Sequence, residues 1–481
     1  MLAVPYHYQV ALAIGLAFMC FTEMALAKGV SANLPLQVHP RVEAQIDKVM
    51  AITSGPPLTK PYKVVELERR VKQIESNYPQ LFNDLNLYLQ KYQKAAGITD
   101  VNAKVAVADS GDMLRPNARG GFFSDSYSFG ASGFYQPSDY LLVSAGGTFS
   151  EHADFRHTNT YVTVGMEYFQ LEAGYREHWF SPFKYSSMLV STHAKTSPSV
   201  TFSNASPITS WDIRYEIFYA KLEEVEEIRL GENYYRGSPR HGGIHLSFSP
   251  LDFWTIGVNR TLQFGGGARS FSFGDVFEAL LNPAGKDNVG DIETNDPNYE
   301  FGNQQASVTT VFNLDWGTPF QLYGELGGED TVGESNYSLG NQSLSFGIYL
   351  PALTDSVSLR LEHNQWATKW YVHHLYPAGY TNAGVIMGHW AAEQRLEGTS
   401  PKASVDTLGI DWQIDPIRRI ETVVSLIQAD AEAAVENYET GYQIQLDYTQ
   451  ITPYGEIGVG VLFGKSTLGE NQSALQLSYF W

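Results

Sequence analysis

The sequence has little of three things that would place it in the common protein classes. It has one cysteine in 481 residues, Cys20, which excludes a disulfide framework and a cysteine-based zinc site. Its 32 lysines and arginines are outnumbered by 52 aspartates and glutamates. This net charge of −20 argues against a nucleic-acid partner, because phosphate binding depends on clustered basic side chains. The chain also lacks an internal apolar run of about eighteen residues, which excludes a polytopic helical membrane protein.

These absences leave one kind of membrane protein open. A transmembrane β-barrel alternates apolar and polar side chains, so its mean hydropathy is only mildly negative, as it is here at −0.22. The composition agrees with a barrel, since only 17% of the residues are charged and the chain contains 43 glycines, 29 tyrosines and 26 phenylalanines.

The first residues have the pattern of an export signal. Residues 11–21 form a short apolar stretch, and Ala25-Leu26-Ala27 follows as a small-x-small cleavage pattern. The stretch is too short to cross a bilayer. We therefore predict a signal peptide over 1–27. An exported, acidic chain rich in tyrosine and glycine is typical of the outer membrane of a Gram-negative bacterium.

Residues 28–100 differ from the rest of the chain in charge and in periodicity. They carry a small excess of basic residues, whereas 101–481 is strongly acidic. Their apolar residues recur at the spacing of a helix. Gly55-Pro56-Pro57 separates the first two stretches, and Gly97 is placed where the last helix would stop. We predict a small periplasmic helical bundle over 28–100. Its three apolar stripes are Val42, Ile46, Val49 and Met50; Leu67, Val71 and Ile74; and Leu81, Leu85, Leu89 and Tyr92.

From about residue 101 the period changes to two, which is that of a strand with one apolar face. A soluble sandwich would alternate in the same way, but many runs here reach 10–14 residues, longer than is usual in soluble sheets. The links between runs alternate between tight turns and longer polar loops, as in outer-membrane barrels. We predict an all-β transmembrane barrel over 101–481 with about eighteen antiparallel strands, sixteen being the alternative.

The end of the chain supports a barrel. One face of the last strand carries Leu475, Leu477, Tyr479 and Trp481, which resembles the signal read by the barrel assembly machinery.

The alternation of the strands also turns charged wall residues inward, where they either fill the lumen with salt bridges or set the field of an open channel. The inward set is Asp212, Arg214, Glu216, Glu325, Arg360, Glu362, Asp411, Asp447 and Glu456.

Other residues with the chemistry of a site are weaker candidates. His373 and His374 are adjacent, so we expect their rings to point apart and to chelate poorly. The acidic residues of 286–300, Glu300 among them, lack the spacing of a calcium loop and read as a solvated loop. No Gly-x-Ser-x-Gly elbow is present. We predict no enzyme, no metal site and no cofactor. The glycines of 264–269 (FGGGAR) indicate close backbone approach in a loop.

Several short motifs follow one another in a specific order over about 160–395. They are 172–179 (EAGYREHW), 241–250 (HGGIHLSFSP), 264–269 (FGGGAR), 323–327 (YGELG) and 376–380 (YPAGY). With them the chain resembles the Wzi-type capsule-assembly family of outer-membrane surface lectins. This resemblance implies a closed barrel of about eighteen strands, a periplasmic helical bundle and a glycan-binding outer face. The chain departs from the family pattern at 179–182 (WFSP) and 191–194 (STHA).

Two predicted outer loops, 231–241 and 371–390, carry the residue types that sugars bind. Aromatic faces pack against sugar C–H surfaces, while charged and amide groups bond to hydroxyls. We predict that a monomeric barrel in outer-membrane lipid binds capsular polysaccharide or exopolysaccharide there, and a porin-like diffusion channel for small solutes is the alternative. The predicted glycan-binding residues are Tyr234, Tyr235, Arg236, Tyr371, His374, Tyr376, Tyr380 and Trp390.

Overall fold

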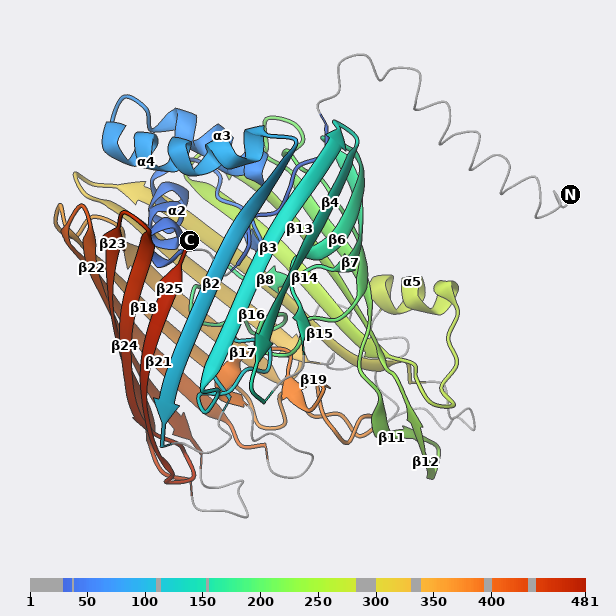
Figure 1. Ribbon diagram of the computed structural model, residues 1–481. Coiled ribbons are helices and arrows are strands. Elements are labelled where there is room, and N and C mark those ends of the chain that lie inside the picture. The colour runs from blue at the N-terminus through green and yellow to red at the C-terminus, as the bar shows by residue number, and fades with distance from the viewer. Residues whose placement is uncertain are drawn as a thin grey trace, which may run out of the picture.

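The computed structural model describes residues 29–36, 39–109, 114–152, 155–282, 300–329, 339–392, 400–430 and 438–481. The predicted signal peptide, 1–27, lies outside the described residues. The described chain forms a closed antiparallel β-barrel with helices at one end (Figure 1). The barrel closes where β2 (Ala96–Ala108) pairs with β25 (Asn471–Phe480), from Asn102 opposite Phe480 to Ala108 opposite Ala474.

Eighteen wall positions are formed by the described strands, which confirms eighteen rather than sixteen. Two short pieces, β5 and β6, both pair with β4 and share one position. Between β2 and β25 the wall consists of β3 (Tyr127–Ser138), β4 (Leu141–Ser150), β5 (Arg156–His157), β6 (Thr160–Met166), β7 (Phe169–Tyr175), β9 (Ser199–Ser203), β10 (Arg214–Lys221), β13 (Arg240–Leu251), β14 (Trp254–Phe264), β15 (Gly302–Asp315), β16 (Pro319–Glu329), β17 (Gln342–Leu350), β18 (Val357–Trp366), β21 (Ala403–Asp415), β22 (Arg418–Ala429), β23 (Gly441–Thr452) and β24 (Gly455–Lys465).

The alternation of the strands sorts their side chains between outside and inside. On β14, Val258 points outward and is exposed, while its neighbour Asn259 points inward and is buried. A closed barrel with an apolar outer surface is stable only in lipid, because water would have to cover that surface. Exposed outward residues of the same kind are Val143, Leu246, Val308, Leu326, Leu344, Leu361, Leu446, Val459 and Leu477.

The two ends of the barrel differ in the length of their links. At the short-turn end, β13 and β14 or β23 and β24 are joined by two residues, and the C-terminus and most of the helices also lie there (Figure 1). At the opposite, long-loop end, the links are longer. This strict alternation of links is the one predicted.

Three helices at the short-turn end confirm the predicted apolar stripes. They are α2 (Pro40–Ile52), α3 (Val64–Gln73) and α4 (Pro79–Leu89), followed by the 3-10 turn η2 (Gln90–Gln93). The amide of Asn313 on β15 donates to the carbonyl oxygens of Met50 at 2.9 Å and Thr53 at 2.6 Å, which joins the end of α2 to the wall. None of the described helices is long and apolar enough to cross a membrane.

Two segments leave the wall and fill the barrel; we call 176–198 and 367–392 the lumen plug. They contribute Phe180, Leu189 and Tyr371 to one buried apolar cluster that also includes Phe218 on β10 and Val405 on β21. Because β10 and β21 lie far apart round the wall, the cluster reaches across the lumen. The plug contains β8 (Trp179–Phe180), which pairs with β1 (Thr59–Lys60), as well as β19 (Thr381–Asn382), β20 (Val385–Ile386) and η4 (Trp390–Ala392).

Two expectations about boundaries are wrong. The alternation of 170–180 predicts one strand over these residues, but β7 ends at Tyr175, because the residues from His178 to Phe180 are all buried and no longer alternate. Gly97 does not stop a helix. It lies within β2, opposite Phe134, since β2 begins at Ala96.

Candidate functional site

A hairpin projects from the long-loop end between β10 and β13 (Figure 1). It consists of β11 (Val225–Leu230) and β12 (Asn233–Gly237), with Arg229 opposite Tyr234 and Ile228 opposite Tyr235. Tyr234 is 52% exposed and Tyr235 is 40% exposed. The hairpin therefore presents two aromatic rings to the surroundings of the barrel.

The base of the hairpin is fixed against the barrel. Ile228 is fully buried and packs with Leu375 and Tyr376 of the plug. The backbone N–H of Arg229 donates to the carbonyl oxygen of Leu375 at 2.9 Å. These contacts fix the position of the hairpin, so that a ligand need not order its backbone.

The glycine run 265–267 makes the close approach that its sequence predicts. All three glycines have positive φ, and a Cβ on Gly237 of the hairpin would lie 2.2 Å from the backbone nitrogen of Gly267. Only glycine on both sides lets the two backbones pass at this distance.

Arg236 is exposed on the same hairpin and forms an ion pair with Glu224, with Glu226 at 3.6 Å. An exposed pair of this kind contributes about 0–1 kcal/mol to stability. Since a guanidinium has five N–H donors, the pair leaves donors that can reach a hydroxyl or carboxylate of a ligand.

Three of the predicted glycan-binding tyrosines lie inside the barrel, so the expectation of a surface loop is wrong for this part of 371–390. Tyr371, Tyr376 and Tyr380 are each about 1% exposed or less. The hydroxyl of Tyr376 donates to the carbonyl oxygen of Gly265 at 3.1 Å, and that of Tyr380 lies 2.6 Å from Nε2 of His241. Their hydroxyls are satisfied within the protein, as buried polar groups require.

The remaining predicted residues are accessible to different degrees. His374 has a side chain that is 46% exposed, and Trp390 is half-buried against the apolar cluster of the plug. Together with the three hairpin residues, His374 and Trp390 make five of the eight predicted side chains that are at least partly exposed.

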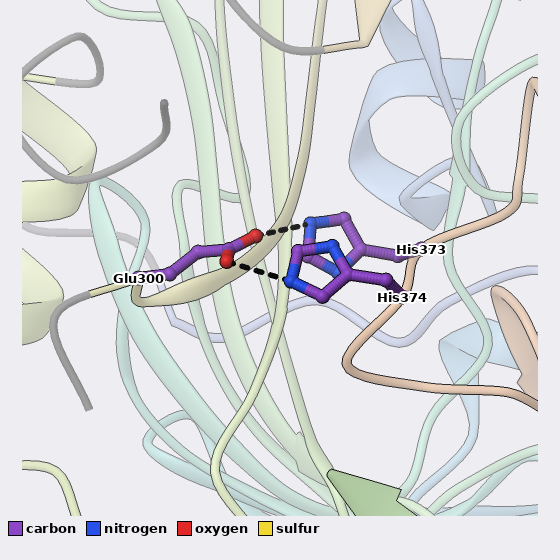
Figure 2. A group of neighbouring side chains, drawn as sticks. All are labelled: Glu300, His373 and His374. Atoms are coloured by element: carbon purple, nitrogen blue, oxygen red, sulfur yellow. Dashed lines mark ion pairs between the residues drawn. The ribbon is translucent and has the colours of Figure 1, made fainter. Parts of the chain in front are cut away.

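A carboxylate is held between two adjacent imidazoles next to this hairpin (Figure 2). Nε2 of His373 lies 3.1 Å from Oε1 of Glu300, and Nε2 of His374 lies 2.9 Å from Oε2. The two rings stack with centroids 4.9 Å apart. The expectation that the adjacent rings point apart is therefore wrong, as is that of a solvated Glu300, which is buried. The other acidic residues of 286–300 before Glu300 lie outside the described residues.

Burial alone would raise the pKa of Glu300, but the hydrogen bonds from His373 and His374 outweigh it and lower the pKa to about 2. Two imidazoles and a carboxylate are also ligands that zinc accepts. However, Nδ1 of His373 accepts the backbone N–H of Leu375 at 3.3 Å, which places the proton on Nε2, the atom that faces Glu300. The three side chains therefore form a hydrogen-bonded clamp that joins the start of β15 to the plug.

Ion pairs join the plug to α2 and to the wall. Lys184 of the plug has Nζ 3.1 Å from Asp47 on α2, 3.8 Å from Glu43 and 3.7 Å from Glu421 on the wall. Burial lowers the pKa of Lys184, but the three carboxylates outweigh this and raise it, so the ammonium stays charged. Arg360 on β18 also reaches Asp47, at 3.4 Å.

The inward orientation predicted for charged wall residues is confirmed where these residues are buried. Arg214, Glu216, Glu325, Arg360, Glu362 and Glu456 are among them. Glu362 accepts the backbone N–H groups of Lys184 at 2.8 Å and Tyr185 at 3.1 Å, so the wall binds the plug directly. Of the two interpretations of these charges, the filled lumen with salt bridges is the one observed.

Sequence reasoning missed the partners of these wall charges. Lys184 and the clamp residue Glu300 lie in irregular segments whose path cannot be deduced from periodicity. The only signal was the failure of alternation over 181–196, which marks a segment that is not part of the wall.

The fold and the apolar outer surface define a membrane β-barrel whose lumen is filled by its own chain. A sequence profile of the family described as capsule assembly protein Wzi matches residues 95–399, which is more than half of the chain. The chain belongs to this family, and it is an outer-membrane protein. The two departures from the family pattern, 179–182 and 191–194, both fall in the lumen plug.

One solved structure supports the fold. The barrel is similar to Wzi of Escherichia coli, described as an outer membrane protein involved in group 1 capsule assembly and a carbohydrate-binding β-barrel. The identity is 15% and the TM-score 0.68, with 94% of this chain and 99% of that chain covered. OccK3 (OpdO) of Pseudomonas aeruginosa has 10% identity and a TM-score of 0.48, with 82% and 98% of the two chains covered. No curated protein matches the sequence.

Proposed function

We propose that this barrel binds capsular polysaccharide or exopolysaccharide at the cell surface and supports the attachment of capsule, without turnover of the polymer. The binding surface consists of the exposed residues of the hairpin β11–β12, namely Tyr234, Tyr235 and Arg236, together with His374 and Trp390 of the plug. Membership of the capsule-assembly family and the carbohydrate binding described for Escherichia coli Wzi support this assignment.

The observation that carries the proposal is the hairpin with its exposed tyrosines. Exposed aromatic side chains that lie together on one loop outside the lipid form a candidate binding surface. Tyrosine rings pack against the C–H faces of sugars, and the neighbouring Arg236 donates to hydroxyls or acidic groups. Because β11 is fixed to the plug by its backbone, the backbone of the binding residues is ordered before the polymer arrives.

The same proposal fixes the orientation of the barrel. The long-loop end faces the outside, as in other outer-membrane barrels, and the short-turn end with α2, α3 and α4 faces the periplasm. The protein works as a monomer in the lipid of the outer membrane. The barrel assembly machinery recognises its last strand, β25, which ends next to Trp481.

The alternative of a diffusion channel for small solutes has less support. A porin needs a continuous water-filled path, whereas here the plug and the ion pairs of Lys184 lie across the lumen. A binding protein needs no such path.

The retention of polymer by cells tests the proposal. A deletion strain is complemented with the wild-type chain, with the double variant Tyr234→Ala/Tyr235→Ala, or with Tyr454→Ala. Tyr454 is a matched control, because it is 82% exposed but lies at the short-turn end. We expect polymer in the medium with the double variant and polymer on the cells with the other two. Full retention of polymer by the deletion strain would overturn the proposal.

A further inference from the structure

One helix lies outside the barrel wall, separate from the three at the short-turn end (Figure 1). It is α5 (Phe273–Leu281), in the link between β14 and β15. Ser272 forms a capping box with Asp275: the backbone N–H of Asp275 donates to Oγ of Ser272 at 3.2 Å, and the backbone N–H of Ser272 donates to Oδ2 of Asp275 at 2.7 Å. Two orphan N–H groups are thus satisfied, so that the helix begins at a defined residue.

The inner face of α5 covers outward-pointing positions of the wall. On β14, Gln263 points inward and donates to the carbonyl oxygen of Gly379 in the plug. Its neighbours Leu262 and Phe264 therefore point outward, yet both are buried. Ala279 is the residue of α5 that is fully buried in the same cluster, with Val276 and Leu280 packed against it.

Next to this buried face, the surface of α5 is apolar and exposed. Phe273 is 76% exposed and Phe277 is 64% exposed. They are four residues apart, so they lie one above the other on the same face of the helix. The burial of one phenylalanine side chain contributes about 1.5–3 kcal/mol, so two rings left in water would be a considerable cost.

The height of α5 along the barrel identifies what these rings meet. Trp254 begins β14 at the short-turn end and stacks on Phe312 with ring centroids 5.6 Å apart, as in an aromatic girdle. Phe264 ends the same strand, ten residues further on. With a rise of about 3.3 Å per residue and a tilt of roughly 40°, the two lie about 25 Å apart along the barrel axis, which is the height of the apolar band. Phe264 therefore marks the opposite boundary of the hydrocarbon.

We propose that α5 lies in the membrane boundary at the long-loop end and inserts Phe273 and Phe277 among the acyl chains of that leaflet. On the outer side of β14 the exposed Val258 is followed by Arg260, which donates to Gln304, and then by Leu262 under α5. This polar pair next to α5 agrees with a place at the boundary of the hydrocarbon and not at its centre. A short helix that is apolar on one side, with its acidic residues Asp275 and Glu278 on the opposite side, is the kind that lies in an interface. The barrel is thus held at a fixed depth by a helix as well as by its girdles. This inference does not depend on the proposed glycan binding.

Quenching of a fluorescent label by spin-labelled lipid tests this inference. The natural cysteine is removed by Cys20→Ser. The variant Phe277→Cys is folded as the full chain into phosphatidylcholine vesicles and then labelled. The vesicles contain lipid with a doxyl group either near the headgroup or deep in the acyl chain. Val258→Cys is the control in lipid and Glu232→Cys, at the tip of the hairpin, is the control in water. Folding of each variant is checked by its shift on unheated gels.

We expect the label at 277 to lose fluorescence as the label at 258 does, and more with a shallow than with a deep doxyl position. Fluorescence that stays unquenched at 277, as at 232, would overturn the inference. It would then indicate that the two rings face water, a polysaccharide or another protein.

Discussion

At the scale of single residues, tyrosine shows why the candidate site was only partly predictable. Tyr235 is opposite Ile228 in the hairpin and Tyr376 packs against Ile228, yet Tyr235 is exposed and Tyr376 is buried. Both stand in aromatic-rich stretches of the sequence, so composition predicts a binding surface for each. What distinguishes them is the path of the backbone through the lumen, and no local pattern determines that path.

The clamp around Glu300 allows a prediction at this scale. We expect Glu300→Gln to lower the free energy of unfolding by about 1–3 kcal/mol, because the charge-assisted bonds to His373 and His374 are lost. Urea unfolding in lipid vesicles measures the change. Glu227→Gln, at an exposed position on the hairpin, is the control and should change little. Equal stability of the two variants would contradict the role of the clamp.

The stability that the clamp contributes should also depend on pH. The pKa of Glu300 is about 2 in the folded chain, below its ordinary value of 4.5, so its carboxylate favours the folded state. This contribution is fully present above about pH 4.5 and is lost as the pH falls toward 2. We therefore expect the difference in stability between the wild type and Glu300→Gln to shrink over that range. A difference that stays constant would show that the charge of Glu300 is not involved.

At the scale of elements, periodicity predicts the strands and helices that have one buried and one exposed face. It does not predict segments that are surrounded by protein on all sides. The wall strands and the helices at 40–89 have one apolar face, so their period identifies them, and the tight turns fix their order. The plug segment 176–198 is surrounded by protein and has no alternation to read. For this reason the eighteen strands were predicted, whereas β8 and the contacts of Lys184 were not.

The ion pairs of Lys184 predict how the plug is held. We expect Lys184→Met to destabilise the barrel by about 1–3 kcal/mol, because the buried Asp47 loses its nearest cation and keeps only Arg360. Glu421 and the partly exposed Glu43 also lose a cation. The urea midpoint of the folded variant in vesicles measures this. Lys195→Met is the matched control: Lys195 pairs with Glu223 at 2.8 Å on the surface, where the loss should be at most about 1 kcal/mol. Similar losses in both variants would mean that the buried network contributes no more than the exposed pair.

At the scale of the whole molecule, the fold combines an apolar exterior with an interior filled by two segments and by α2. The exterior follows from the alternation of each strand. The filling follows from long links that turn inward and satisfy the wall charges, as Glu362 does for the backbone of Lys184 and Tyr185. A barrel filled in this way presents its function on its loops rather than in its lumen.

This arrangement predicts the electrical behaviour of the protein. We expect the purified barrel to show no steady conductance in a planar bilayer, because the plug and the ion pairs of Lys184 block the lumen. We expect the variant Lys184→Met to show openings, because its plug lacks these ion pairs. Steady conductance of the size of an open porin in the wild type would contradict the filled lumen.

The most direct test of the account is the binding of polysaccharide by the purified protein. Wild-type barrel, Tyr234→Ala/Tyr235→Ala and the control Tyr454→Ala are immobilised and exposed to labelled capsular polysaccharide. The account predicts that the wild type and Tyr454→Ala retain the polymer and that the double variant loses most of this retention. Equal retention by all three, or none by the folded wild type, would contradict the proposal that this hairpin holds the capsule.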